Sequence, residues 1–134
     1  MCGRTFYKGM RSNKRGAALV EFAIVALLLF TLVFGIIDFG LLLKSHLALS
    51  QVAREGARSA GLGYEDYDVR AKCVDWANKL GLQNFDPSKV QIERTEPDPG
   101  GQVTVIIEYE HSMVTGLFGN QPRTLRTTMV MRRE

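Results

Sequence analysis

Residues 22–37 of the chain read FAIVALLLFTLVFGII, an apolar run around which the rest of the chain is arranged. It contains neither a charged residue nor a proline. Extended back to residue 17, it comprises about 21 residues, which at ~1.5 Å per residue form a helix of about 31 Å. Because the hydrocarbon core of a bilayer is roughly 30 Å thick, the stretch predicts a membrane-spanning helix.

Basic residues are gathered in front of this stretch, with no acidic residue among them. They are Arg4, Lys8, Arg11, Lys14 and Arg15. The positive-inside rule therefore predicts a cytoplasmic N-terminus and an extracytoplasmic C-terminal part. Subtracting these five from the 17 Lys and Arg leaves 12 against 14 Asp and Glu, a net charge of −2. The folded part thus lacks the basic surface that nucleic-acid binding requires, and we expect no nucleic-acid partner.

A cleaved secretory signal and a buried core helix are two other segments that are rich in apolar residues. A cleaved secretory signal has a shorter apolar region of roughly 7–15 residues and a small-residue cleavage site. Here the apolar run is longer and continues with helical periodicity into residues 41–61. A buried core helix would not explain the one-sided basic residues. The pattern favours a membrane helix that is retained.

Two carboxylates lie within or beside this helix. Asp38 falls where the helix should leave the bilayer, and we interpret it as an interfacial carboxylate in preference to a partner contact within the membrane. Glu21 lies inside the apolar stretch near the cytoplasmic face, where a carboxylate needs a partner or access to the interface.

The residues after the membrane segment predict two helical faces. Small residues recur along residues 49–60 with the spacing i, i+3, i+4, i+7, and so predict a stripe for close packing. Arg54, Glu55 and Arg58 lie on the other faces, either solvated or in a subunit contact. A second helix is predicted over residues 65–80, ended by Gly81. Its expected core face comprises Val69, Cys73, Trp76, Ala77 and Leu80.

Within this second helix, a core anchor is favoured over ligand stacking for Trp76. We interpret Cys73 as a small core residue. Cys2 and Cys73 lie on opposite sides of the apolar segment, so we expect no disulfide between them.

Alternating apolar residues predict three strands in the C-terminal half. They run over residues 89–95, around residues 103–109 and around residues 125–131, with a turn at residues 97–101. The loop of residues 112–123 carries Leu117 and Phe118, which either contact a partner or the membrane surface or fold back over the core. The expected fold class is α+β and pilin-like: a long N-terminal transmembrane helix continues into a small domain with a second helix and a three-stranded antiparallel sheet.

Enzymatic signatures are missing from the sequence. His46 and His111 are far apart, and no nucleophile elbow, P-loop, HExxH or CxxC pattern occurs. We therefore expect no catalytic residue, no metal site and no cofactor.

The junction in front of the apolar stretch resembles a known processing site. Arg15-Gly16-Ala17-Ala18-Leu19-Val20-Glu21-Phe22 is similar to the cleavage site of type IV prepilins of the Tad (Flp) branch, with Glu and Phe at mature positions five and six. Downstream, the sequence VAREGARSA at residues 52–60 resembles the segment that follows the membrane helix in TadE-like proteins. The roughly 75 residues after Ala60 favour a TadE-like minor pilin or pseudopilin over the much shorter major pilin.

This resemblance implies a set of domains and site residues. Residues 1–16 would be a basic leader that is cleaved, residues 17–43 the transmembrane helix, and residues 44–134 the extracytoplasmic domain. Gly16 and Ala17 would flank the cut. Glu21 and Phe22 would serve assembly, with Glu21 pairing with the new α-amino group of its own or a neighbouring subunit.

The implied partners are the prepilin peptidase, other pilin and minor-pilin subunits, the Tad inner-membrane assembly platform and the lipid bilayer. The resemblance implies a single-pass protein of the bacterial inner membrane that takes part in building an adhesive pilus. The alternative is an unprocessed single-span anchor that carries an extracytoplasmic binding domain.

Overall fold

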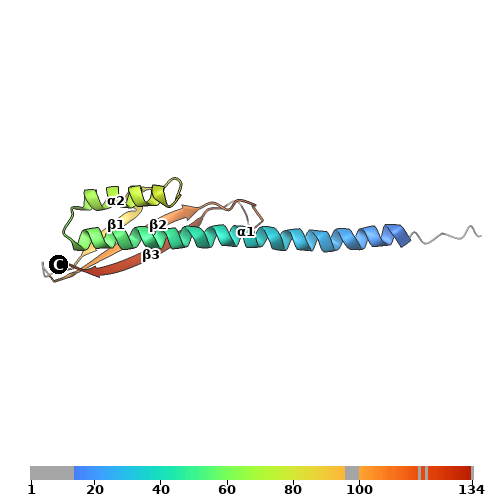
Figure 1. Ribbon diagram of the computed structural model, residues 1–134, viewed down its shortest axis with the longest axis horizontal. Coiled ribbons are helices and arrows are strands. Elements are labelled where there is room, and N and C mark those ends of the chain that lie inside the picture. The colour runs from blue at the N-terminus through green and yellow to red at the C-terminus, as the bar shows by residue number, and fades with distance from the viewer. Residues whose placement is uncertain (1–13, 96–99, 118, 120, 134) are drawn as a thin grey trace, which may run out of the picture.

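The computed structural model describes residues 14–95, 100–117, 119 and 121–133. In chain order they form α1 (Lys14–Gly61), α2 (Asp66–Lys79), a 3-10 turn (Pro87–Lys89), β1 (Val90–Arg94), β2 (Gln102–His111) and β3 (Arg123–Arg132). This confirms the α+β class, with a long apolar helix, a second helix and three antiparallel strands. Figure 1 shows that the domain is gathered around one half of α1, while the other half extends alone.

The N-terminal half of α1 is apolar and uncovered. Its most apolar 18-residue window has a mean hydropathy of 2.7, and none of that window is buried inside the chain. Phe22 and Leu27 remain 71% and 70% exposed. The helix is thus long and apolar enough to cross a membrane, and water would be an unfavourable solvent for this surface.

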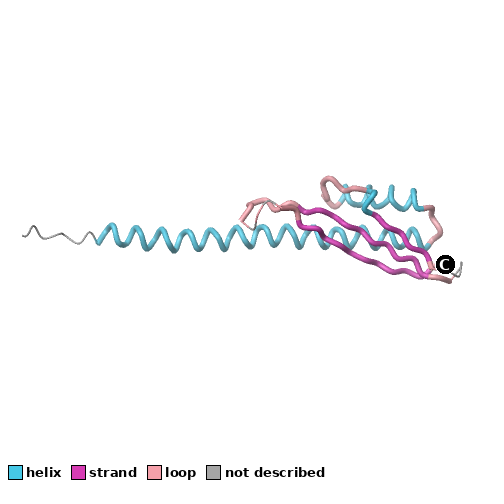
Figure 2. Tube along the Cα trace, turned by 180° about the vertical axis from the view of Figure 1, so that it is seen from behind, coloured by secondary structure: helices cyan, strands magenta, loops and turns pink. Residues whose placement is uncertain are grey.

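The three strands form a sheet in the order β1-β2-β3, with both neighbouring pairs antiparallel. Val105 of β2 stands opposite Ile92 of β1 and Met129 of β3. Because side chains alternate along a strand, one face of the sheet is apolar and packs on α1. The connection from β2 to β3 lies beside α1 where the helix leaves the domain, and the C-terminus lies at the opposite end (Figures 1 and 2).

The predicted stripe of small residues is confirmed as the core face of α1. Val52, Ala53, Ala57 and Ala60 are fully buried there. The tightest approach is at Gly56, where an added Cβ would lie 2.7 Å from Sγ of Cys73 on α2. A glycine at this position therefore sets how closely α1 and α2 can pack.

Glycines lie at the ends of both helices, and the one that follows α2, Gly81, was predicted to end it. α1 ends at Gly61, and Gly63 adopts a φ of 86°, which lets the Tyr64 amide donate to the Ser59 carbonyl. α2 is followed by Gly81 with a φ of 75°, and the Leu82 amide donates to the Ala77 carbonyl.

Part of the predicted core of α2 was wrong. Val69, Cys73 and Ala77 are buried, but Trp76 is 36% exposed and does not anchor the core. Val69, Cys73 and Ala77 are the three buried residues of α2, so its contact face is narrow. Trp76 lies at its flank, and Nζ of Lys79 stands 5.4 Å from the centre of its ring. Residues 96–99, in the predicted turn, and Phe118 lie outside the described residues.

Candidate functional site

The predicted cleavage junction lies in the first turn of α1. The helix begins at Lys14, so Gly16 and Ala17 are helical. Glycine weakens a helix by about 1 kcal/mol relative to alanine. The Gly16–Ala17 bond is therefore in a segment that a protease could extend. Residues 1–13 of the predicted leader lie outside the described residues.

Glu21 and Phe22 are both exposed on the uncovered half of α1. Glu21 follows Ala17 by four residues, so the two lie on the same helical face one turn apart. If the chain began at Ala17, the new α-amino group would lie one turn from this carboxylate. The carboxylate would also lie near the start of the shortened helix, where negative charge is favourable by about 0.3–1 kcal/mol.

Arg54, Glu55 and Arg58 lie on α1 away from the core. Arg54 and Arg58 are exposed, and Glu55 is half-buried. Within the described part of the chain, these three side chains take part in none of the ion pairs, which join other residues. They are available to a neighbouring subunit, and the contact remains a prediction.

Asp38 forms a contact that the sequence did not reveal. Its side chain is 1% exposed, although its neighbours on the helix are apolar and open. Oδ1 accepts hydrogen bonds from the backbone amides of Val114 at 3.2 Å and Thr115 at 3.1 Å, and Oδ2 accepts one from the Thr115 hydroxyl. Its interpretation as an interfacial carboxylate stays a prediction, and the structure adds a partner within the same chain. Asp38 binds the β2–β3 loop, and we call this contact the Asp38 clasp.

A second contact ties the same part of the domain to α1. Oγ of Ser45 lies 3.0 Å from Nδ1 of His111 at the end of β2. Ser45 follows Asp38 by seven residues, two turns later on the same helical face. The chain leaving β2 therefore runs along α1 past Ser45 to Asp38. The domain thus contacts α1 before residue 44, the predicted start of the domain.

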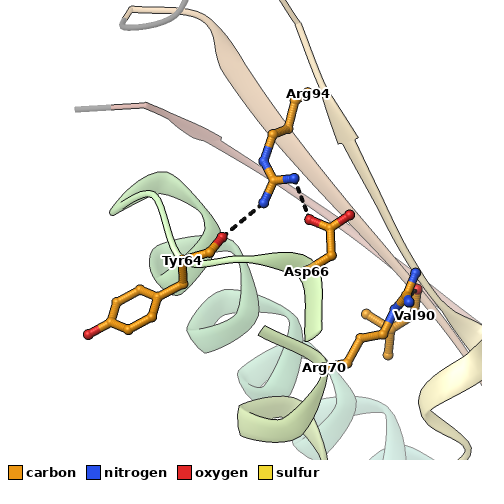
Figure 3. Close-up of polar contacts among 5 residues, drawn as sticks. All are labelled: Tyr64, Asp66, Arg70, Val90 and Arg94. Atoms are coloured by element: carbon orange, nitrogen blue, oxygen red, sulfur yellow. Dashed lines mark hydrogen bonds and ion pairs between the residues drawn. The ribbon is translucent and has the colours of Figure 1, made fainter. Parts of the chain in front are cut away.

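The far end of the domain is held by Arg94 of β1 (Figure 3). Its guanidinium donates a hydrogen bond of 3.0 Å to the Tyr64 carbonyl and pairs with the Asp66 carboxylate. Arg70 of α2 donates to the Val90 carbonyl at 3.3 Å. These contacts fix α2 and the loop before it against β1.

Cys73 is a core residue, as predicted. It is fully buried between α1 and α2, and this burial raises the pKa of its thiol from 9.0 to about 11. A thiol that stays protonated at neutral pH is a poor nucleophile and a poor metal ligand. Among the described residues, no three His, Cys, Asp or Glu side chains come close enough together to hold a metal ion.

Comparison with known families matches the helical part of the chain. Residues 16–58 match the family described as TadE-like protein. The match begins at the predicted cleavage junction and ends within the small-residue stripe, so it confirms the predicted TadE-like resemblance over this segment. Searches among curated proteins and solved structures gave no match.

Proposed function

We propose, from the TadE-like segment at residues 16–58, that this chain is a minor pilin or pseudopilin that takes part in assembling a Tad (Flp) pilus. The observation that carries the proposal is the position of that segment. It begins at Gly16 and includes the whole uncovered apolar half of α1. A TadE-like family suggests a role in a pilus system rather than an enzymatic reaction.

In this account the uncut chain is inserted in the bacterial inner membrane. The basic leader holds its N-terminus in the cytoplasm, and the domain lies outside. A prepilin peptidase cuts between Gly16 and Ala17. Arg15 and Lys14 keep the junction at the membrane surface, where Gly16 makes the helix easier to extend.

Cleavage changes the electrostatics of the helix start. It creates an α-amino group with an ordinary pKa near 8, which is largely protonated at neutral pH. A carboxylate and an ammonium that enter an apolar surrounding separately are each costly, whereas a pair relieves both charges. Glu21 of this or a neighbouring subunit would form that pair, and it would set the axial register of subunits on the assembly platform. Phe22 would pack beside it.

The uncovered half of α1 has two environments in this scheme. Before assembly it is covered by lipid, and in the pilus by the equivalent helices of neighbouring subunits. Either environment removes the exposed apolar side chains from water. Arg54, Glu55 and Arg58 would then lie in the outer layer of the fibre, where charged side chains can pair between subunits.

Two substitutions in the native host test the proposal. Gly16→Leu should give a full-length chain that stays in the membrane, because the bulky side chain obstructs the cut. Glu21→Ala should be cut normally but should not support pilus formation. Gly40→Leu is a matched control for the first variant, because an added Cβ at Gly40 has open space around it on the same helix. Asp75→Ala, which removes an exposed carboxylate on α2, is the control for the second.

The outcome separates two functions. Uncut Gly16→Leu together with cut but non-assembling Glu21→Ala supports the minor-pilin account. Normal pili from both variants would overturn it and would favour an unprocessed, membrane-anchored binding protein.

A further inference from the structure

The position of the outer bilayer surface along α1 follows from the proposed function, in which α1 spans the membrane. The apolar run from residue 17 to residue 37 has the length of a hydrocarbon core, ~31 Å against roughly 30 Å. Asp38 is the first charged residue after Glu21. It therefore lies at the outer edge of the hydrocarbon, and the next one to two turns of α1 lie among the lipid headgroups.

The Asp38 clasp brings part of the domain to this same level. Val114 and Thr115 donate their backbone amides to the carboxylate, so residues 112–117 lie at the bilayer edge rather than above it. The clasp also explains how a carboxylate is accommodated there. Its oxygens are occupied by the loop and covered from the lipid, which lowers the cost of placing a charge at an apolar boundary.

The loop presents apolar side chains outward at this level. Val114 is 70% exposed, the same as Leu27 in the middle of the membrane segment, and Leu117 is 44% exposed. Beside them a surface groove is lined by Phe39, Leu42, Met113 and Leu125 together with Asp38 and Arg123. An apolar groove that includes one basic side chain suits the upper part of an acyl chain and the phosphate of its headgroup.

We propose that residues 112–117 form a second membrane contact, in which Val114 and Leu117 insert at the outer edge of the hydrocarbon. The partner is the phospholipid surface that surrounds α1. Continuity with the membrane segment argues for lipid, because Phe39 on α1 borders the same groove and is 66% exposed. The Asp38 clasp is the positioning element: it holds the loop at this depth and so fixes the orientation of the domain above the bilayer.

Depth-dependent quenching in liposomes tests this contact on the full-length chain. Cys2→Ser and Cys73→Ala remove the native thiols, and a single cysteine is then introduced and labelled with an environment-sensitive fluorophore. The three positions are Val114→Cys in the loop, Phe30→Cys at mid-span and Thr128→Cys on the exposed face of β3. Phosphatidylcholine that carries a doxyl quencher either near the headgroup or deep in the acyl chain is the probe.

The expected result is a distinct pattern at each position. The label at residue 114 should lose fluorescence with the shallow quencher, that at residue 30 with the deep quencher, and that at residue 128 with neither. If residue 30 is quenched but residue 114 behaves like residue 128, the loop contact is overturned while the membrane span stands. If residue 30 is not quenched, the span itself fails and the loop contact fails with it.

Two further measurements test the partner and the clasp. The label at residue 114 could be shielded from water only at a high protein-to-lipid ratio and not be quenched by the labelled lipid. This result would show that a second copy of the chain covers the loop, and it would overturn the lipid contact. Adding Asp38→Ala to Val114→Cys should reduce the shallow quenching, because the amides of Val114 and Thr115 lose their acceptor and the loop is no longer held at this depth. Unchanged quenching would overturn the positioning role of Asp38.

Discussion

Gly56→Ala should destabilise the domain although alanine is the better helix former. The added Cβ would lie 2.7 Å from Sγ of Cys73 and 3.6 Å from Cγ1 of Val105. Favourable contacts between nonbonded heavy atoms begin near 3.5 Å, so either Sγ of Cys73 or the two helices would have to shift by nearly 1 Å. Overpacking of this kind costs about 1–3 kcal/mol. The helix-propensity gain of Ala over Gly is about 1 kcal/mol. The expected net loss is therefore about 1 kcal/mol in the free energy of unfolding.

The same substitution should have the opposite sign when Cys73 is replaced by alanine. Cys73→Ala alone leaves a small cavity and should cost about 1 kcal/mol, similar to other deletions of one buried heavy atom. In that background the Cβ at position 56 enters vacated space, and only the propensity gain of about 1 kcal/mol remains. The coupling free energy between the two sites is thus about 2 kcal/mol, within the range for residues in contact.

Urea unfolding of the full-length chain in detergent micelles measures these values. The fluorescence of Trp76, the single tryptophan, reports on the domain. Gly40→Ala is the control, because its Cβ would have no neighbour within 4 Å, and it should show no coupling to Cys73→Ala. If Gly56→Ala stabilises the domain equally in both backgrounds, the close approach of α1 and α2 at this glycine is refuted.

Three further predictions follow from other contacts. Asp38→Ala should accelerate amide hydrogen exchange at residues 114 and 115 by at least about tenfold, since hydrogen bonds to a charged group contribute roughly 1.5–3 kcal/mol each; wild-type exchange rates would contradict the clasp. The pKa of the Cys73 thiol is about 11 in the folded chain and 9.0 in an ordinary environment. At a pH between these two values, unfolding therefore releases the proton of this thiol. The free energy of unfolding should therefore fall by roughly 2–3 kcal/mol from pH 9 to pH 11, and Cys73→Ala should remove this part of the dependence. Arg94→Met should lower the free energy of unfolding in urea by only about 0.5–1 kcal/mol, because the ion pair of Arg94 with Asp66 is partly exposed. A loss above about 2 kcal/mol would show that this pair stabilises the domain more than its exposure implies.

The elements of this fold could be predicted from the sequence because each has a strong local pattern. The apolar run and the small-residue spacing specify α1, and alternation specifies β2 and β3. Glycines mark the helix ends at Gly61 and Gly81. Each of these patterns extends over a few residues, so it can be recognised without the tertiary structure.

The contacts between distant segments could not be predicted in the same way. Asp38 and Thr115 are 77 residues apart, and neither belongs to a local motif that points to the other. The one sequence feature that indicated a contact was a carboxylate at a membrane boundary. Such a charge needs a polar partner, but the sequence does not show which residue provides it. Helical spacing alone predicts a core position for Trp76, which the structure shows to be exposed. Spacing gives the direction of a side chain, but not how wide the covering surface is, and here the contact face of α2 is narrow.

Cleavage between Gly16 and Ala17 can be measured as the N-terminal sequence of the protein isolated from the membranes of its own host, read by mass spectrometry. We expect a mature chain that begins at Ala17, with residues 1–16 removed. A chain that keeps its leader in cells with an active prepilin peptidase would refute the minor-pilin function and leave a single-span anchor with an extracytoplasmic domain.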